Sequence, residues 1–116
     1  MTMGEAKPMA LDGDQRNPLH EACQEGSIEV AKVLLDEANK NFGQNAVFEM
    51  IYGKDDDGAS PLLLGVGKGG TGIVELLLSY KANPNQKNRE NTFCIHSAAR
   101  TGDLETLKLL ISVTHF

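Results

Sequence analysis

Two cysteines and two histidines are the residues of this chain whose types could together bind a metal ion. His20 lies three positions before Cys23, and Cys94 lies two positions before His96. Zinc takes four such ligands, each within about 2.0–2.3 Å of the metal. A whole repeated unit of sequence separates the two pairs, which corresponds to about 20 Å if helical layers stack at about 10 Å. We therefore expect no metal site, and we see no oxyanion donor or orienting third group for Cys–His catalysis.

A glycine-rich segment resembles a phosphate-binding loop. Residues 65–70 (GVGKGG) match the pattern Gly-x-Gly-x-x-Gly. Nucleotide-binding loops need a preceding strand and an acidic residue at the ribose position, and neither is expected here. Lys68 also lacks the serine or threonine that follows the lysine of a P-loop. The segment is therefore predicted to be a glycine-rich turn between two helices, and no cofactor is expected.

An acidic run, residues 55–58 (DDDG), is the remaining candidate for ion binding. Calcium loops of the EF-hand type alternate their oxygen ligands and close with a glutamate. This run has too few alternating ligands and no closing glutamate at the required spacing. It is predicted to be a turn that opens a structural unit.

Composition limits the classes of partner. The 116 residues include 11 Lys and Arg against 16 Asp and Glu, which gives a net charge of −5. Nucleic acids and anionic membranes are bound by clustered basic residues, so this balance argues against both. No apolar run approaches the roughly 20 residues that cross a bilayer. The N-terminal sequence has no apolar signal-peptide segment, so we expect a cytoplasmic location.

Three segments of the chain repeat one another. They cover residues 16–38, 58–85 and 91–112. His20, Leu63 and His96 hold the same place in the three segments, at intervals of 43 and 33 residues. Positions related by these two intervals are equivalent. A period of this size is typical of a solenoid, in which stacked units share one core.

Each unit carries the signals of two short helices joined by a turn. Asn17 and Ser60 precede prolines at a first helical position, where a capping side chain is favoured. Ser27 and Asp103 stand where a second helix needs its N-cap, and Gly70-Thr71 is a weaker version. The second helices show apolar stripes at helical spacing, namely Ile28, Ala31, Leu34 and Leu35; Val74, Leu77 and Leu78; and Leu104, Leu107, Leu110 and Ile111.

The units resemble ankyrin repeats, whose signature opens with Gly-x-Thr-Pro-Leu-His and closes with Gly-Ala-Asp-x-Asn. The openings here read Arg-Asn-Pro-Leu-His, Ala-Ser-Pro-Leu-Leu and Thr-Phe-Cys-Ile-His. The resemblance implies an all-α ankyrin solenoid of stacked helix-turn-helix units with short finger hairpins. We expect a flexible leader at 1–13, an array at 14–112 and a truncated tail at 113–116. The expected repeats cover about 14–38, 55–87 and 88–112.

Two departures from the ankyrin pattern stand out. The first interval exceeds the ankyrin period of 33 by ten residues, and an apolar insert at 39–54 stands in place of a short finger loop. Residues 46–52 are expected to form a short helix, and packing onto the array is favoured over partner binding. The second departure is the set of glycines at 65–72. Each helix-interior glycine costs about 1 kcal/mol relative to alanine, so the first helix of the middle unit is predicted to be the least stable element.

The resemblance implies non-catalytic protein binding on a concave surface built from finger tips and first helices. Arg89 and Arg100 are the expected anchors for an acidic segment of a partner, and Glu21 and Glu25 would repel other partners. Along the array this surface grades from acidic to basic. The expected contact residues are Gln15, Arg16, Glu21, Gln24 and Glu25; Asp55, Asp56, Leu64 and Lys68; and Lys87, Arg89, Glu90, Ser97, Arg100 and Thr101.

Three contexts for the array remain open, and in each the partner is another protein. The last helix ends on apolar residues without an outward turn, which indicates a longer array with neighbouring repeats. The first context is a cytoplasmic adaptor or scaffold. The second is the cytoplasmic N-terminal ankyrin region of a transient receptor potential-type cation channel. The third is an ankyrin segment attached to an enzyme domain outside this chain.

Overall fold

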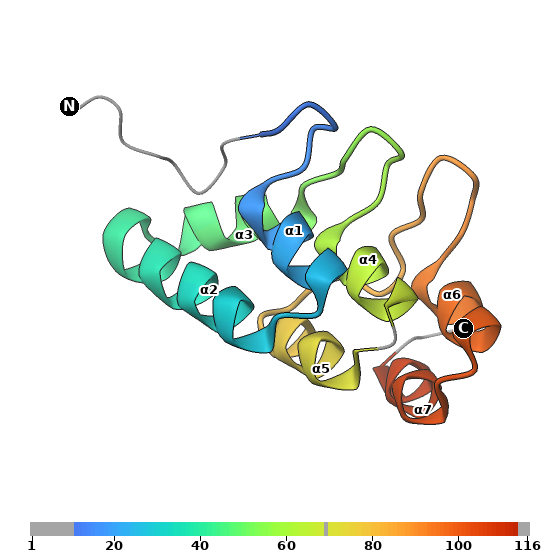
Figure 1. Cartoon of the computed structure of the whole chain (residues 1–116). Coiled ribbons are helices and arrows are strands. Elements are labelled where there is room, and N and C mark those ends of the chain that lie inside the picture. The colour runs from blue at the N-terminus through green and yellow to red at the C-terminus, as the bar shows by residue number, and fades with distance from the viewer. Residues whose placement is uncertain (1–10, 69, 114–116) are drawn as a thin grey trace.

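The computed structural model describes residues 11–68 and 70–113, which contain seven helices, and six of these form two rows (Figure 1). The first row consists of α1 (Pro18–Glu25), α4 (Pro61–Gly67) and α6 (Cys94–Thr101). The second row consists of α2 (Ile28–Phe42), α5 (Thr71–Ser79) and α7 (Leu104–Val113). The additional helix α3 (Gln44–Tyr52) packs against α1, α2 and α4. This arrangement confirms the predicted all-α solenoid of helix-turn-helix units.

Three loops project from one edge of the array, on the side of the first row (Figure 1). They are finger 1 (residues 11–17), finger 2 (residues 53–60) and finger 3 (residues 83–93). In finger 2 the Asp55 carboxylate accepts hydrogen bonds from the N–H groups of Asp57 (2.9 Å) and Ala59 (2.8 Å). Asp12 and Asn88, the equivalent residues, accept the same pair of bonds in fingers 1 and 3. The acidic run is thus a turn, as predicted.

Backbone hydrogen bonds join neighbouring fingers. The Asp56 N–H donates to the Asp14 carbonyl at 3.0 Å, and the Arg89 N–H donates to the Asp57 carbonyl at 2.9 Å. The two donors are equivalent positions, and so are the two acceptors. Because the bonds are made by the main chain, finger spacing is kept while the finger side chains vary.

The first helices begin as the sequence predicts. The Asn17 side chain accepts hydrogen bonds from the N–H groups of Leu19 and His20, at 2.9 and 3.0 Å. The Ser60 hydroxyl accepts one from the Leu63 N–H at 3.2 Å. These bonds satisfy N–H groups that have no partner inside the helix.

The second helices begin in three different ways. Asp103 accepts a hydrogen bond from the Thr106 N–H at 3.2 Å, as a capping residue should. Ser27 occupies the N-cap of α2, but its side chain makes no capping bond, contrary to the prediction. Gly70 precedes α5, and the Thr71 hydroxyl instead reaches the Asp103 carboxylate of the next unit at 3.2 Å. The predicted caps therefore mark the right positions, although only one side chain acts as a cap.

The insert is part of the core. Helix α2 continues to Phe42, so the first insert residues lengthen a helix rather than form a loop, and Gly43 ends it with a φ of +90°. The predicted short helix is present as α3, and it begins two residues earlier than expected. The Met50 carbonyl accepts a hydrogen bond from Asn17 Nδ2 at 3.1 Å. Packing onto the array is confirmed by three buried side chains, Val47, Met50 and Ile51.

The described glycines of the middle unit lie mainly in helices rather than in the turn that the sequence predicts. Gly65 and Gly67 belong to α4, and Gly72 belongs to α5. A Cβ atom at position 65 would lie 2.9 Å from Ile73 Cγ2, and one at position 72 would overlap Ile28 Cδ1. The absence of these Cβ atoms lets α5 approach both α4 and α2 closely, which offsets the poor helix propensity of glycine.

The described ends of the array differ slightly from the predicted boundaries. Asp12 and Gly13 belong to finger 1, whereas the sequence predicts a leader at 1–13. Val113 is the last residue of α7, whereas the sequence predicts a tail from that residue onward. Residues 1–10 and 114–116, which hold the rest of the predicted leader and tail, lie outside the described residues.

The core runs along the array and thins at both ends. Leu104 and Ile111 are 67% and 49% exposed, although the sequence places them in a buried stripe. At the other end Val30 and Val33 are 52% and 59% exposed. Helix α7 packs on α5 and α6 from one side, and within the described residues no further layer covers its other side. A solenoid buries an apolar position only where a neighbour is stacked on it.

Candidate protein-binding groove

A groove of about 310 Å³ lies between the fingers and the first row of helices. Its floor is apolar and consists of Ala59, at the end of finger 2, and Leu63 and Leu64 of α4. Gln24 of α1 and Arg100 of α6 also line it, so three successive units contribute to one groove. The stacking of the units therefore creates the groove, and no single unit contains it.

Opposite charges line the two walls of this groove. Lys68 and Arg100 come from the helical wall, Asp57 and Glu90 come from the fingers, and all four side chains are exposed. The ion pairs among the described residues all involve Arg16 and none of these four. The groove therefore presents cations on one side of an apolar floor and carboxylates on the other.

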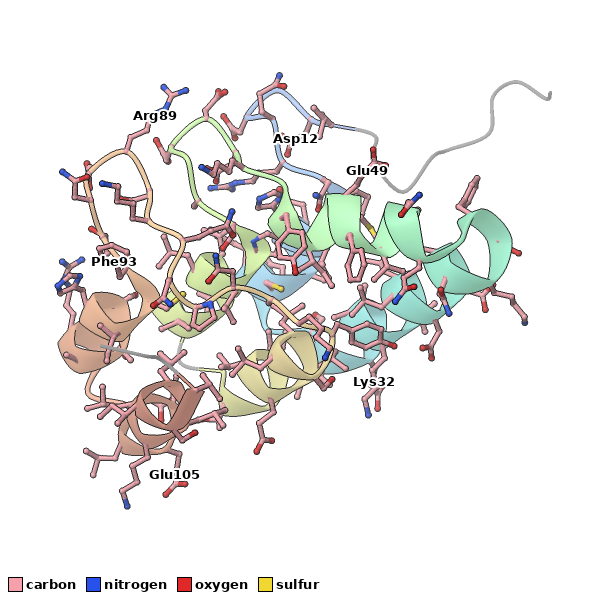
Figure 2. All side chains as sticks on the ribbon, turned by 180° about the vertical axis from the view of Figure 1, so that it is seen from behind. Asp12, Lys32, Glu49, Arg89, Phe93 and Glu105 are labelled. Atoms are coloured by element: carbon pink, nitrogen blue, oxygen red, sulfur yellow. The ribbon has the colours of Figure 1, made fainter. Side chains whose placement is uncertain are left out.

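A second hollow, of about 440 Å³, lies on the fingers and is lined by residues of all three. Lys87 and Arg89 line it together with Gln15 and Asp56. Figure 2 shows Arg89 at the tip of finger 3, pointing away from the helices. Arg89 and Arg100, which the sequence predicts as joint anchors, therefore line two different hollows, and Asn88 lines both of these.

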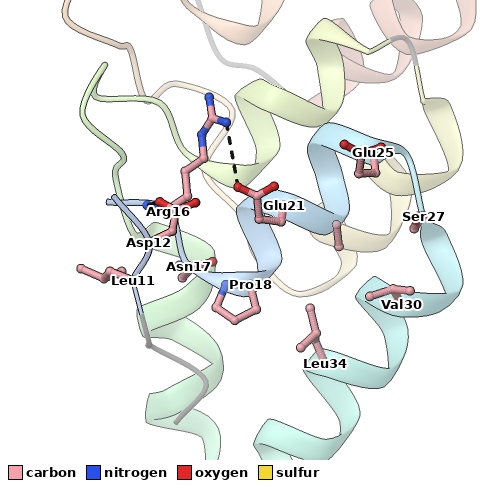
Figure 3. A pocket seen from close by; sticks show the side chains of 11 residues that line it. Leu11, Asp12, Arg16, Asn17, Pro18, Glu21, Glu25, Ser27, Val30 and Leu34 are labelled. Atoms are coloured by element: carbon pink, nitrogen blue, oxygen red, sulfur yellow. Dashed lines mark hydrogen bonds and ion pairs between the residues drawn. The ribbon is translucent and has the colours of Figure 1, made fainter. Parts of the chain in front are cut away.

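A third hollow, of about 620 Å³, lies at the first-unit end of the array between finger 1, α1 and α2 (Figure 3). Asp12, Glu21 and Glu25 are at its rim, and Arg16 Nη1 lies 3.9 Å from Glu21 Oε2. This hollow is mostly apolar, with Leu11, Pro18, Ala22, Val30 and Leu34 in its lining.

The fifteen residues predicted at the binding surface are divided among these places. Six line the groove, namely Gln24, Leu64, Lys68, Glu90, Ser97 and Arg100. Five line the hollow on the fingers, namely Gln15, Asp55, Asp56, Lys87 and Arg89. Three line the end hollow, namely Arg16, Glu21 and Glu25, and Thr101 lines none of the three.

Asp55 supports the fold, and we correct its assignment as a contact residue. Its side chain is 2% exposed, and its second carboxylate oxygen lies 3.3 Å from Arg16 Nε. Burial alone would lower the pKa of the Arg16 guanidinium, but the hydrogen bond and charge of Asp55 raise it. This pair holds finger 1 to finger 2, so its carboxylate is already occupied.

Asp57 lines the groove, although it is not among the predicted contact residues. Its signal is present in the sequence, because Asp57 is equivalent to Glu90 at an interval of 33 residues. The sequence likewise marks Leu63 as a position of the repeat and gives no sign that it forms part of the floor.

Comparison with known proteins identifies the array. A model of ankyrin repeats in three copies matches residues 38–115, and a model of a single ankyrin repeat matches residues 14–45. The chain belongs to the ankyrin repeat family. Ankyrin repeats are protein-interaction modules that present extended concave binding surfaces.

Similar proteins share the ankyrin repeats but are much longer. An ankyrin repeat-containing protein of Schizosaccharomyces pombe is 30% identical over 104 residues, which cover 87% of this chain and 41% of that protein. The B-cell lymphoma 3 protein homolog of Mus musculus is 30% identical over 134 residues, which cover 91% of this chain and 30% of that protein. The transient receptor potential cation channel subfamily A member 1 of Homo sapiens is 24% identical over 129 residues, covering 87% and 12%. This chain spans less than half of each relative, so the similarity concerns the array.

The histidine of the first ankyrin repeat joins two repeats. His20 Nδ1 accepts a hydrogen bond from the Asn17 N–H at 3.0 Å, and Nε2 lies 2.9 Å from the Ala59 carbonyl oxygen. Nε2 carries the proton, because a carbonyl oxygen only accepts. Burial lowers the pKa of His20, so the ring is held neutral. The equivalent His96 is exposed, and its Nδ1 accepts from the Phe93 N–H at 3.2 Å.

The two cysteines of the array are buried thiols. Burial raises the pKa of Cys23 and of Cys94 to about 12 in each case. The thiolate is the nucleophilic and metal-binding form, so neither side chain is activated. Within the described ranges, no three His, Cys, Asp or Glu side chains are grouped to hold a metal ion. No helix in the part of the chain that the structure describes has the length and apolar character to cross a bilayer.

Proposed function

We propose that this ankyrin array is a non-catalytic protein-binding module and that its partner binds in the groove between fingers 2 and 3 and helices α4 and α6. The observation that supports this site is the convergence there of six expected contact residues from three repeats. A ligand in the groove would bridge adjacent repeats, which is how a solenoid uses its concave side.

The chemistry of the groove favours an extended acidic segment with an apolar side chain. The apolar side chain would rest on the floor formed by Leu63 and Leu64. Arg100 can pair with a carboxylate through two parallel hydrogen bonds, and Lys68 lies along the same wall as a second cation. Asp57 and Glu90 on the finger wall would repel a ligand that is acidic on both edges. The carboxylates of the partner should therefore face the helices.

A peptide selection tests this proposal directly. The immobilised chain is used to select from a displayed library of random peptides, and the affinity of a recovered peptide is measured by isothermal titration calorimetry. We expect the recovered peptides to carry acidic residues next to an apolar one. The double variant Lys68→Glu with Arg100→Glu should weaken binding at least tenfold, which is about 1.4 kcal/mol.

The convex surface offers a matched control. Lys32 and Lys108 are equivalent, exposed positions on α2 and α7, and Lys32 lies on the second-row side in Figure 2. The double variant Lys32→Glu with Lys108→Glu makes the same change in charge and should bind the peptide normally. Loss of binding in this control, with the groove variant unaffected, would place the site elsewhere. The single variant Arg89→Glu tests whether the peptide binds in the hollow on the fingers instead of the groove. It should have little effect on the affinity for the peptide.

A further inference from the structure

Among the described residues, the two end faces of the array expose apolar side chains at complementary positions. Within the chain, the Thr71 hydroxyl of the second repeat lies 2.8 Å from the Thr106 hydroxyl of the third repeat. The position equivalent to Thr71 in the third repeat is Leu104, and the position equivalent to Thr106 in the first repeat is Val30. These two residues are 67% and 52% exposed. One more step of the same stacking would bring the two exposed apolar side chains together.

We propose that the chain associates head to tail with a second copy of itself, the third repeat of one copy stacking on the first repeat of the next. The geometry is the one that already relates successive repeats within the chain. The contact therefore continues an existing interface, and each of its elements can be read from an equivalent contact inside the array.

The apolar part of this contact would fill a hollow on the second copy. The 620 Å³ hollow on the first repeat is lined by Val30 and Leu34 of α2 (Figure 3). Leu104 and Ile111 lie on one face of α7 and are exposed. Their equivalents in the first repeat, Ile28 and Leu35, are partly and fully buried beneath the second repeat. The α7 face of one copy thus matches the hollow of the next in character and in position.

Hydrogen-bonding groups match in the same register. His20 Nε2 bonds the carbonyl of Ala59, so His96 Nε2 would meet the carbonyl of Arg16 in the second copy. That carbonyl accepts one hydrogen bond, from the Asp12 N–H at 3.0 Å, whereas the Ala59 carbonyl accepts two. A carbonyl oxygen has two lone pairs, so Arg16 has room for the histidine.

The fingers continue the pattern. Arg89 donates its N–H to the carbonyl of Asp57, and Asp56 donates to that of Asp14. By the same register Gly13 of the second copy would donate to the carbonyl of Glu90. The finger ladder would then run from one copy into the next.

Charge is also complementary at this junction. A Cβ atom at Gly67 would lie 3.7 Å from Ser97 Oγ, so these positions of adjacent repeats face each other. Their equivalents across the junction are Arg100 of one copy and Glu21 of the next. The Glu21 side chain is 47% exposed, and its Oε2 lies as far as 3.9 Å from Arg16 Nη1. This loose ion pair leaves the Glu21 carboxylate able to pair with a second guanidinium. Opposite charges at a contact favour the correct register.

A head-to-tail contact joins two different surfaces and so produces open chains rather than a closed dimer. Sedimentation velocity of the full chain should therefore show an average mass that rises from 12.5 kDa with concentration and passes the dimer. Leu104→Glu destroys one face and Val30→Glu destroys the other, so each variant alone should remain monomeric. An equimolar mixture should form a one-to-one dimer and nothing larger, because each variant supplies the face that the other lacks.

The mixture also shows that both variants are folded, since an unfolded variant could not pair. Lys32→Glu, on the exposed convex side of α2, is the matched control and should assemble like the unmodified chain. A monomer at every concentration would overturn the proposal, as would an assembly that survives both substitutions or stops at a dimer. If the chain stays monomeric and only extra repeats fused at its ends stabilise it, then the end faces are covered by neighbouring repeats of a longer polypeptide and not by a second copy. Because Arg100 also lines the groove, peptide binding is measured separately in the monomeric Leu104→Glu variant.

Discussion

The first and third repeats have the same sequence pattern but very different surroundings. His20 is fully buried and connects Asn17 to Ala59 of the next repeat, whereas the equivalent His96 is exposed. Leu35 is 0% exposed, and the equivalent Ile111 is 49% exposed. The second repeat covers both His20 and Leu35 of the first repeat. In a solenoid the burial of a position thus depends on the neighbouring repeat as much as on the residue itself.

The opposite difference in burial is found on the other face of each repeat. Positions that face the preceding repeat are buried in the third repeat and exposed in the first. Thr106 is 0% exposed, whereas the equivalent Val30 is 52% exposed. A polar side chain is therefore buried where an apolar one meets solvent. Side-chain type alone gives the wrong order of burial here.

The largest expected effect comes from truncating an equivalent pair of apolar residues. Leu35→Ala should lower the free energy of unfolding by about 2–5 kcal/mol, because it leaves a cavity in the core. Ile111→Ala should cost less than about 1 kcal/mol, because half of its side chain is already exposed. Urea unfolding monitored by circular dichroism measures both. Equal costs for the two variants would contradict the difference in coverage.

The second-largest expected effect is the difference in stability cost between substitutions of the equivalent histidines, His20 and His96. His20→Gln should cost about 1–3 kcal/mol, because it disturbs two hydrogen bonds in a buried site. His96→Gln should be nearly neutral, because its ring is exposed and bonds only within its own turn. Thermal unfolding at pH 7 tests the pair. A similar loss in both variants would show that the link to the second repeat contributes little.

The buried histidine also predicts a dependence of stability on pH. Burial lowers the pKa of His20 below 6.5 in the folded chain, so the unfolded chain takes up this proton at a higher pH. Its contribution to stability is complete above about pH 6.5 and is lost as the pH falls toward the lowered pKa. The slope of unfolding free energy against pH in this interval should therefore decrease in His20→Gln. It should persist in His96→Gln, and an unchanged slope in the first variant would contradict the assignment.

The smallest expected effect concerns the first turn of the first helices. Asn17 caps α1, whereas the equivalent residue before α6 is Phe93, which has no side-chain hydrogen bond to the helix. Phe93→Asn should raise the free energy of unfolding by about 0.5–1 kcal/mol by supplying the missing cap. The same substitution at Phe48, inside α3, provides no cap and should not stabilise the protein. Loss of stability at position 93 would show that the partly buried Phe93 ring matters more than the cap.

Helix positions were largely predictable from the sequence, because their signals are local. Asn17 and Ser60 before prolines mark the first helices, and both side chains cap as predicted. The apolar stripes mark the second helices, although the first and last members of the third stripe, Leu104 and Ile111, are exposed. The binding surface was less predictable, since Asp55 is buried and Arg89 and Arg100 line different hollows. Repeat register gives a residue its place in a unit but not whether its side chain is buried or free to bind a partner.

The sequence by itself determined the repeat, its register and the ankyrin family, because each depends on residue types at fixed intervals. Tertiary structure decided which members of an equivalent set are buried, since that depends on the unit stacked against them. It also decided the role of Gly65. Helix propensity indicates only that this glycine weakens α4, whereas the structure shows that its missing Cβ makes room for Ile73 of α5. The groove likewise exists only in three dimensions, because its charged walls come from fingers and helices that meet only when the repeats stack.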